Sequence, residues 1–341
     1  MTVREIAELA GVSIGTVDRV LYKRGRVSAG TKAKIEGIIE QYRFSPNPMA
    51  RQLKRGRAQH FCVFLPQRDQ DAGYWSQVLQ GIHRAADEIC SLGVETEIVE
   101  FDRYSREGFE NAAAEILSKK PDGLIFSPIM SERTRPFIEK IRQAAIPCIF
   151  FDANLPGIDP LCAIGQDSFR GGYLAGRLMH LFAGRIEKPV VILDTYGEDF
   201  HIIRRREGFL KYAGEYGFPT LVQEYSGYKG SEISVEEIGR FLRENPALTG
   251  VFITNCMAHR VADAAKERRR GRDFLLIGYD LIPNNRLSLE EGWIDAIISQ
   301  RPEYQGREAL LNLYRRIVLD QQIPARVEIP LDVYFKENIP V

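Results

Sequence analysis

From His60 onward, short apolar runs alternate with longer amphipathic segments, and this pattern constrains the fold more than any other feature. The first run, Phe61–Leu65, is apolar at every position, as in a strand covered by helices on both faces. The segment after it, about Trp75 to Leu92, has the pattern of a helix. Further runs that predict strands are Val94–Phe101, Gly123–Ser127, Cys148–Asp152, Val190–Asp194, Gly250–Thr254, Leu275–Tyr279 and Ala296–Ser299. The alternation predicts an α/β fold of parallel sheets covered by helices.

The number of predicted strands is large for a single twisted sheet, so we expect two lobes with a ligand between them. A chain of 341 residues suits two or three domains. No G-x-G-x-x-G follows the first apolar run and no G-x-x-x-x-G-K-[ST] occurs, which argues against a dinucleotide or P-loop site. No apolar run reaches the roughly 18 residues of a membrane-spanning helix, so we expect a cytoplasmic protein without a membrane partner.

The first 58 residues differ from the rest in charge. They hold 12 lysines and arginines against 5 aspartates and glutamates, a net charge of +7, and the remainder carries −7. A small basic head on an acidic body is typical of a polyanion-binding module joined to another domain. A solvated charged face would be the alternative.

The head also shows the pattern of three short helices. Val3, Ile6, Ala7 and Ala10 would form one apolar helix face, and Gly11 permits a tight turn after it. Ser13 can cap a second helix to about Tyr22, and Ser28 a third to about Tyr42. Two helices joined by a tight turn predict a helix-turn-helix, whose second helix enters the major groove of DNA.

These residues resemble the head of lactose-repressor-type (LacI/GalR) regulators. The matching residues are Val3–Ser13, Thr16-Val17, Arg19–Leu21, Arg26–Ser28, Thr31, Pro46-Asn47 and Ala50–Leu53. The resemblance covers the whole chain and implies a helix-turn-helix head over 1–46, a hinge helix and linker over 47–58 and a two-lobed body over 59–341. It places lobe 1 at about 59–166 and 301–329, and lobe 2 at about 167–300 and 330–341.

The resemblance implies a dimer on near-palindromic double-stranded operator DNA. Its hinge helix would insert Leu53 into the minor groove, unless this segment is a plain linker with Leu53 packed on the body. The residues implied to contact DNA are Ser13, Ile14, Gly15, Thr16, Asp18, Arg19, Tyr22, Arg26, Ser28, Thr31, Asn47, Ala50, Leu53 and Lys54.

Asp18 departs from the family, which usually has a phosphate-contacting serine there. An aspartate repels phosphate, so it would either accept a hydrogen bond from a cytosine N4 or hold Arg19 in place. Ile14 and Gly15 occupy the two main base-reading positions without a hydrogen-bonding side chain. The operator sequence therefore does not transfer from relatives.

In open α/β sheets, ligands bind outside the carboxyl ends of the strands. The residues at those ends predict an effector site with carboxylates, an arginine, amides and aromatic rings, which suits a polyhydroxylated ring such as a sugar. The candidates are Tyr74, Trp75, Ser127, Asp152, Arg205, Asn255, Asp280 and Gln300. With two carboxylates and one arginine, the site favours a neutral or singly charged ligand.

The family's body looks like a periplasmic sugar-binding protein, and the resemblance carries the polar candidates over, with Arg205 opening the segment Arg205–Phe209. Alternatives remain for each residue. Asp152 and Asp280 could cap helices, Asn255 could serve a local turn, Arg205 could be a surface residue among neighbouring arginines, and Tyr74 or Trp75 could be core. Asp167 is expected to cap a helix. The triplets Arg204–Arg206 and Arg268–Arg270 should be mostly solvated.

The sequence shows no catalytic set. The five histidines are scattered without metal-ligand spacing, no G-x-S-x-G occurs, and the five cysteines include no C-x-x-C. We therefore expect no enzyme activity, no cofactor and no metal, and thiols that are reduced and mostly buried. The prediction is a transcription regulator, most simply a repressor, controlled by a sugar or sugar derivative. A nucleobase-responsive regulator and a sugar-processing enzyme with a DNA-binding module are the alternatives.

Overall fold

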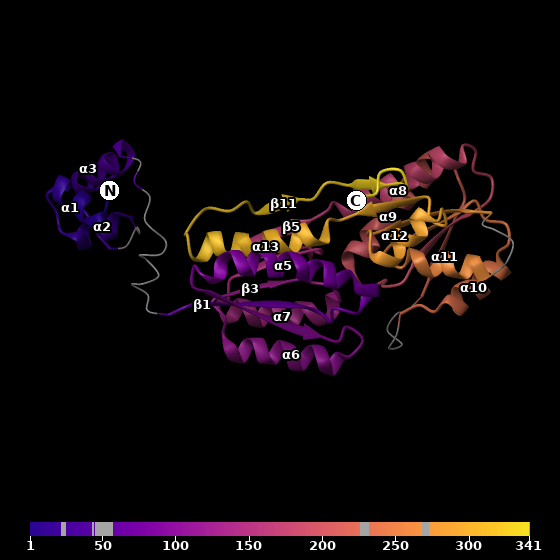
Figure 1. Cartoon of the computed structure of the whole chain (residues 1–341), viewed down its shortest axis with the longest axis horizontal. Helices are drawn as coiled ribbons and strands as arrows, with labels where there is room; N and C mark the ends of the chain where they lie inside the picture. Colours follow the sequence, from indigo (N-terminus) through magenta and orange to yellow (C-terminus); the bar gives the residue numbers. More distant parts are fainter. Residues whose placement is uncertain (22–24, 43, 45–56, 226–231, 268–272, 341) are drawn as a thin grey trace. The chain divides into compact units, whose positions relative to one another are not determined.

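The computed structural model describes residues 1–21, 25–42, 44, 57–225, 232–267 and 273–340. The chain divides into two units, Met1–Ala58 and Gln59–Val341, which we call the head and the body (Figure 1). Among the described residues, no helix combines the length and apolar character needed to cross a bilayer.

The head consists of α1 (Val3–Ala10), α2 (Ile14–Leu21) and α3 (Ala29–Gln41). Thr2 begins α1 in a reciprocal capping box with Glu5, and Gly11 ends it at φ 71°. The Ser13 and Ser28 hydroxyls accept hydrogen bonds from the backbone N–H three residues later, at 3.2 and 3.3 Å. The small core between the helices consists of Ile6, Ala7, Ala10, Val17, Val20 and Ile35.

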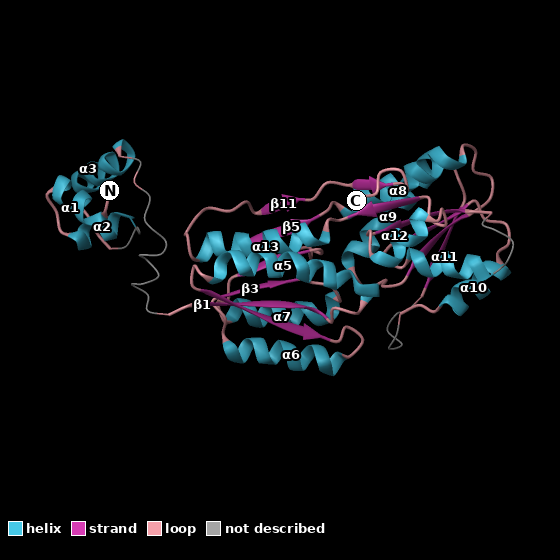
Figure 2. Ribbon diagram, viewed as in Figure 1, coloured by secondary structure: helices cyan, strands magenta, loops and turns pink. Residues whose placement is uncertain are grey.

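Lobe 1 of the body is a six-stranded parallel sheet in the order β11-β5-β4-β3-β1-β2. Helices α5 and α13 cover one face and α6 and α7 the other (Figures 1 and 2). The strands are β1 (Gln59–Pro66), β2 (Val94–Phe101), β3 (Gly123–Phe126), β4 (Cys148–Phe151), β5 (Cys162–Gly165) and β11 (Arg326–Glu328). The helices are η1 (Asp71–Gly73), α5 (Tyr74–Cys90), α6 (Arg106–Lys119), α7 (Ser131–Gln143) and α13 (Pro302–Ile317).

Lobe 2 repeats this plan in the order β12-β10-β9-β8-β6-β7, with β12 antiparallel to β10. Its strands are β6 (Val190–Asp194), β7 (Thr220–Glu224), β8 (Gly250–Ile253), β9 (Leu275–Tyr279), β10 (Ala296–Ser299) and β12 (Asp332–Tyr334). Its helices are α8 (Ser168–Ala183), α9 (Phe200–Tyr216), α10 (Val235–Glu244), α11 (Ala258–Glu267) and α12 (Pro283–Glu290). Each lobe thus has helices on a mainly parallel sheet, as the alternating pattern predicts.

The chain crosses between the lobes after β5, after β10 and after β11. Gln166 lies on the first crossing and joins it to the other two, because its amide nitrogen donates to Ser299 O at 2.6 Å and to Pro330 O at 2.7 Å. These crossings bring the carboxyl ends of both sheets to the space between the lobes.

The predicted fold class is confirmed, and every predicted apolar run overlaps a strand of the structure. Four further strands, β5, β7, β11 and β12, were not predicted individually. They are three to five residues long, and most residues of β7, β11 and β12 are at least partly exposed. Such short strands lack the continuous apolar run on which the prediction depends.

Candidate functional site

The space between the lobes contains a small cavity, lined mostly by buried residues near the carboxyl ends of both sheets. Seven of the eight predicted effector residues line it: Tyr74, Trp75, Asp152, Arg205, Asn255, Asp280 and Gln300. Ser127 is not among the residues that line this cavity. It is buried and donates to the Asp152 carboxylate at 3.2 Å, so it supports a lining residue instead.

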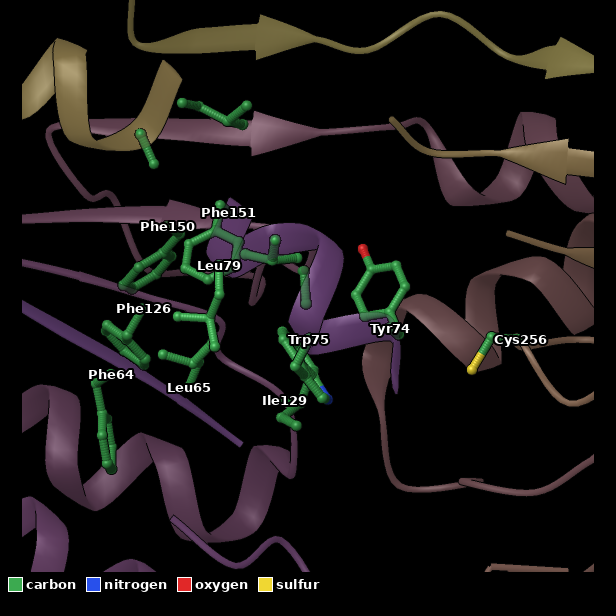
Figure 3. Packing of buried hydrophobic residues seen from close by; sticks show 14 of the residues in the cluster. Phe64, Leu65, Tyr74, Trp75, Leu79, Phe126, Ile129, Phe150, Phe151 and Cys256 are labelled. Carbon is green, nitrogen blue, oxygen red and sulfur yellow. The ribbon is translucent and has the colours of Figure 1, made fainter. Parts of the chain in front are cut away.

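Tyr74 and Trp75 begin α5 and belong both to the core and to the cavity wall (Figure 3). The rings meet edge to face with centroids 5.1 Å apart. The Tyr74 hydroxyl donates to Asp152 at 2.6 Å, and the Trp75 indole N–H donates to Asp71 at 2.6 Å. Each aromatic residue therefore holds a buried carboxylate in a fixed orientation.

Arg205 is the main donor of the cavity. It extends from α9, where Gly172 and Gly208 let α8 and α9 pack closely: a Cβ on Gly172 would lie 1.8 Å from the carbonyl oxygen of Arg205. The side chain is 1% exposed, donates from Nη1 to Thr254 O at 2.8 Å and stacks 3.7 Å from the Tyr279 ring centroid. Among the described residues, its Nε and Nη2 have no hydrogen-bond partner. Two buried charged donors are thus left for a ligand.

Asp280 and Gln300 form the opposite, accepting part of the site. The Gln300 amide nitrogen donates to the Asp280 carboxylate at 2.9 Å, and the Gln300 backbone N–H donates to it at 3.3 Å. Burial raises the pKa of Asp280 to about 7 and also raises the pKa of Asp152 above its ordinary value. Both aspartates have positive φ, 62° and 65°. Asp280 does not cap the next helix, since Ile282 is the N-cap of α12.

Asn255 combines the predicted ligand position with the alternative role in a local turn. Its side-chain oxygen accepts from Met257 N at 3.1 Å, as in an Asx-turn, and its amide nitrogen donates to the Thr195 hydroxyl. The turn orients the residue at the end of β8, where it lines the cavity. The two interpretations are therefore compatible.

Arg103, Asp71 and Asp199 also line the cavity, and the sequence analysis missed them. Arg103, two residues after β2, is 3% exposed and lies between two carboxylates: Nη1 is 2.5 Å from Asp71 and Nη2 is 2.9 Å from Asp199. Its guanidinium stacks 3.7 Å from the Tyr196 ring centroid. Because Arg103 belongs to lobe 1 and Asp199 to lobe 2, the ion pair joins the lobes. Arg103 follows the carboxyl end of β2, so the rule that ligands bind beyond strand ends would have identified it if it had been applied to this strand.

These residues correct the expected charge of the site. We expected two carboxylates and one arginine. The cavity is lined by four carboxylates and two arginines, which are Asp71, Asp152, Asp199, Asp280, Arg103 and Arg205. Arg103 neutralises part of the added negative charge because it pairs with Asp71 and Asp199. The remaining groups still offer two acceptors, Asp152 and Asp280, beside the free donors of Arg205.

The two lobes touch across the cleft in this structure. Met130 N donates to Asp199 at 2.7 Å, and the Gln77 amide nitrogen donates to Leu281 O at 3.1 Å. The cavity between them has a volume of about 30 Å³, which is room for only a few water molecules. A ligand of the size of a sugar can therefore enter only if the lobes separate or side chains move.

In the first arginine triplet, Arg204 and Arg206 are partly exposed and only Arg205 is buried. Arg204 pairs with Glu207, and Arg206 lies 2.8 Å from the buried Asp194. The second triplet, 268–270, lies outside the described residues. As predicted, Asp167 caps α8, accepting from Arg170 N at 3.0 Å.

One group of side chains has ligand types suited to a metal ion. Single ligand atoms of His60, Cys62 and Glu97 lie within 4.8 Å of one another on β1 and β2. Glu97 already accepts from His60 at 2.9 Å and pairs with Lys119, and burial raises the pKa of the Cys62 thiol to about 12. These contacts favour a hydrogen-bonded cluster over a thiolate metal site.

The candidate DNA contacts in the head are largely on its surface. Ser13, Ile14, Gly15 and Arg19 on and before α2 are exposed, and Thr16 and Asp18 are partly buried. Arg26 and Ser28 are exposed and Thr31 is partly buried. The remaining candidates lie outside the described residues: Tyr22, Asn47, Ala50, Leu53 and Lys54.

Comparisons with known proteins agree with this two-part organisation. Residues 2–47 match the family of bacterial regulatory proteins of the lacI type, and residues 62–318 match the periplasmic binding protein domain. The HTH-type transcriptional regulator DegA of Bacillus subtilis is 29% identical over 82% of this chain and 81% of its own length. The HTH-type transcriptional repressor PurR of Actinobacillus pleuropneumoniae is 26% identical over 99% of this chain and 98% of its own length.

Solved structures show the same fold. A putative LacI transcriptional regulator from Bacteroides fragilis superposes with a TM-score of 0.77 and 26% identity, over 83% of this chain and 98% of the other. GanP, a glucose-galactose binding protein from Geobacillus stearothermophilus, superposes with a TM-score of 0.73 and 24% identity, over 84% of this chain and 100% of the GanP chain. The chain belongs to the periplasmic binding protein domain family through residues 62–318 and carries a head of the bacterial lacI regulatory type at residues 2–47, so it is a DNA-binding transcription regulator whose body takes a small-molecule effector.

Proposed function

We propose that this regulator is a cytoplasmic homodimer that represses transcription from a near-palindromic operator and responds to a sugar or sugar derivative bound between its lobes. The observation that carries the sugar proposal is Arg205, which has two buried donors without a partner among the described residues and lines the same cavity as the Asp152 and Asp280 carboxylates. A sugar hydroxyl both donates and accepts hydrogen bonds, so neighbouring hydroxyls can satisfy such donors and acceptors together.

Two further features support a sugar. Tyr74 and Trp75 provide an aromatic wall beside the polar groups, an arrangement typical of small-molecule sites. Among structures with the same fold, GanP is a glucose-galactose binding protein, and a solute-binding protein from Burkholderia graminis was solved with D-arabinose. A nucleobase is less favoured, because Trp75 is packed edge-on between Tyr74 and Phe151 and its N–H is held by Asp71.

Effector control would act through the relation of the two lobes. Arg103–Asp199 and Gln77–Leu281 join the lobes when they are in contact, and an effector between them changes the balance of these contacts. Coupling of this kind between two sites typically amounts to about 1–3 kcal/mol. The predicted hinge, 47–58, would transmit the change to the head, and most of it lies outside the described residues.

The test is a thermal-shift screen of the full chain against pentoses, hexoses, their phosphates and nucleobases. A ligand at 100 times its Kd adds about 2.7 kcal/mol to the free energy of unfolding of the domain that binds it. We expect a sugar to stabilise the body and Arg205→Ala to weaken that sugar's binding about tenfold or more, since hydrogen bonds to charged groups contribute about 1.5–3 kcal/mol. Without effector, the operator affinity of Arg205→Ala should stay within a few-fold of that of the parent protein.

Lys211→Ala is the matched control, since Lys211 is an exposed cation on the same helix and pairs only with Glu215 among the described residues. Stabilisation by nucleobases and not by sugars would replace the sugar with a nucleobase effector. Turnover of a stabilising sugar would establish the enzyme alternative. An unchanged sugar affinity in Arg205→Ala would remove Arg205 from the site.

A further inference from the structure

A recess of about 260 Å³ lies beside the small cavity in the cleft, and Asp152 and His201 line both. Its walls are the crossing after β5, the loop after β4, the start of α9 and Arg326 on β11. The recess is close to the lower end of the volumes of small-molecule sites, about 300–1,000 Å³. Of these two spaces the recess is the larger, and Asp152 is the one predicted effector residue that lines it.

Two buried polar atoms in the lining of this recess have no partner among the described residues. Gln166 is 8% exposed, and its side-chain oxygen is unpaired while its nitrogen joins two crossings of the chain. His201 has an unpaired Nδ1, and burial lowers its pKa well below the ordinary value, so its ring is neutral. Unsatisfied buried polar atoms are rare in native proteins, and a ligand with hydroxyl groups would satisfy both.

The other walls are aromatic and balanced in charge. Phe169 and Phe200 line the recess from the starts of α8 and α9. Its charged groups are two carboxylates, Asp152 and Asp167, and two arginines, Arg204 and Arg326. Arg204 is already paired with Glu207 and lies 4.8 Å from the Phe169 ring centroid. Aromatic surface with balanced charge favours a neutral group with an apolar face over a phosphate.

We propose that this recess is a second sugar subsite, so that the effector has two rings, one held by Arg205 and Asp280 and a neutral hydroxylated ring between Phe169, Phe200 and His201. The inference rests on the proposed sugar function and specifies the effector as a disaccharide or glycoside. Asp152, which lines both spaces, would accept hydrogen bonds where the two rings join.

The test measures binding of monosaccharides, their phosphates and the disaccharides built from them to the full chain by calorimetry. We expect a disaccharide to bind at least tenfold more tightly than either of its monosaccharides. Ala163→Phe, which adds a ring at a residue lining the recess alone, and Phe169→Ala, which removes an aromatic wall of the recess, should each abolish this advantage and leave monosaccharide affinity unchanged. Lys211→Ala is again the control on α9.

The outcomes separate this proposal from the sugar function itself. Equal affinities for a monosaccharide and its disaccharides, unaffected by Ala163→Phe, would overturn the second subsite and keep the sugar effector. Tightest binding of a sugar phosphate, lost in Arg204→Ala, would make the recess a phosphate subsite and overturn the neutral ring. Binding of no sugar in any form would overturn both proposals.

Discussion

The head and the body present their candidate sites in opposite ways. The candidate DNA contacts of the head on α2 belong to one short stretch, and several of them, such as Ile14 at 48% exposure, lie on the surface. The cavity of the body is lined by residues from loops far apart in the sequence, and Arg205 and Asp280 are at most 2% exposed. A surface site can be recognised in one local pattern, whereas a buried cleft exists only after distant segments come together.

The two units differ in their cores as well. In the described part of the head, the core contains six buried apolar residues, whereas the body has two clusters built on two six-stranded sheets. A core of this size has little stability in reserve. The comparison predicts that damage to the head removes DNA binding alone, and that damage to the cleft removes effector response alone.

The largest effect is expected from a charge in the core of the head. Val17 is fully buried, so Val17→Asp places an unpaired carboxylate among apolar side chains and should unfold the head. Operator binding should fall more than a hundredfold, while calorimetry should show unchanged effector affinity in the body. Leu9→Asp carries the same charge at a position 50% exposed and is the control. Loss of effector binding in Val17→Asp would show that the two units do not fold separately.

The next effect concerns the ion pair that joins the lobes. Arg103→Ala leaves Asp71 and Asp199 buried without their cation, which typically costs about 3–5 kcal/mol. Denaturant unfolding should show this loss in the body, and the unfolding of the head should be unchanged. Arg142→Ala, which removes an exposed arginine paired with Glu139, should leave both transitions within about 0.5 kcal/mol. A similar small change in Arg103→Ala would mean that water replaces the ion pair.

A smaller effect should appear with pH. Because burial raises the pKa of Asp280 to about 7, its protonated form dominates below that pH and no longer offers a carboxylate to the effector. We expect effector affinity to fall about tenfold from pH 8 to pH 6. The free energy of unfolding of the unliganded body should change with pH in the opposite direction. A pKa that is raised in the folded state favours folding at low pH, and this contribution is lost as pH rises through 7.

Asp280→Asn tests the pH dependence of both effector affinity and stability, because an amide does not titrate. The variant should bind effector weakly at every pH, and the stability of its unliganded body should depend less on pH between 4 and 7 than that of the parent protein. A tenfold pH dependence of binding that persists in Asp280→Asn would assign the titration to another carboxyl of the cleft, such as Asp152.

The smallest effect is expected on the surface of the head. If Asp18 accepts from a cytosine N4, Asp18→Ser should reduce discrimination at one base pair by about 1 kcal/mol and raise overall affinity, since a charge that repels phosphate is lost. Competition among operators substituted at single base pairs measures both quantities. Weaker binding with unchanged base preference would instead indicate that Asp18 orients Arg19. No change in either quantity would place Asp18 away from DNA.

The sequence by itself determined the class of the fold and seven of the residues that line the cavity. Apolar runs mark strands because a parallel strand is buried on both faces, and the rule that ligands bind at strand ends then selected Tyr74, Asp152, Arg205 and Asp280. The capping of the head helices was also predictable, because a cap depends on residues three positions apart, as for Ser28 and Thr31.

Tertiary structure alone decided how these groups pair. The bridge from Asp71 through Arg103 to Asp199 joins residues 32 and 96 positions apart, and no local pattern encodes such a contact. Ser127 lies at a strand end, yet its hydroxyl is hydrogen-bonded to Asp152 and the residue is not part of the cavity lining. The recess beside His201 likewise forms where the crossing after β5 meets the start of α9. Burial and charge pairing depend on which distant surfaces exclude water together, and that is settled only when the lobes are assembled.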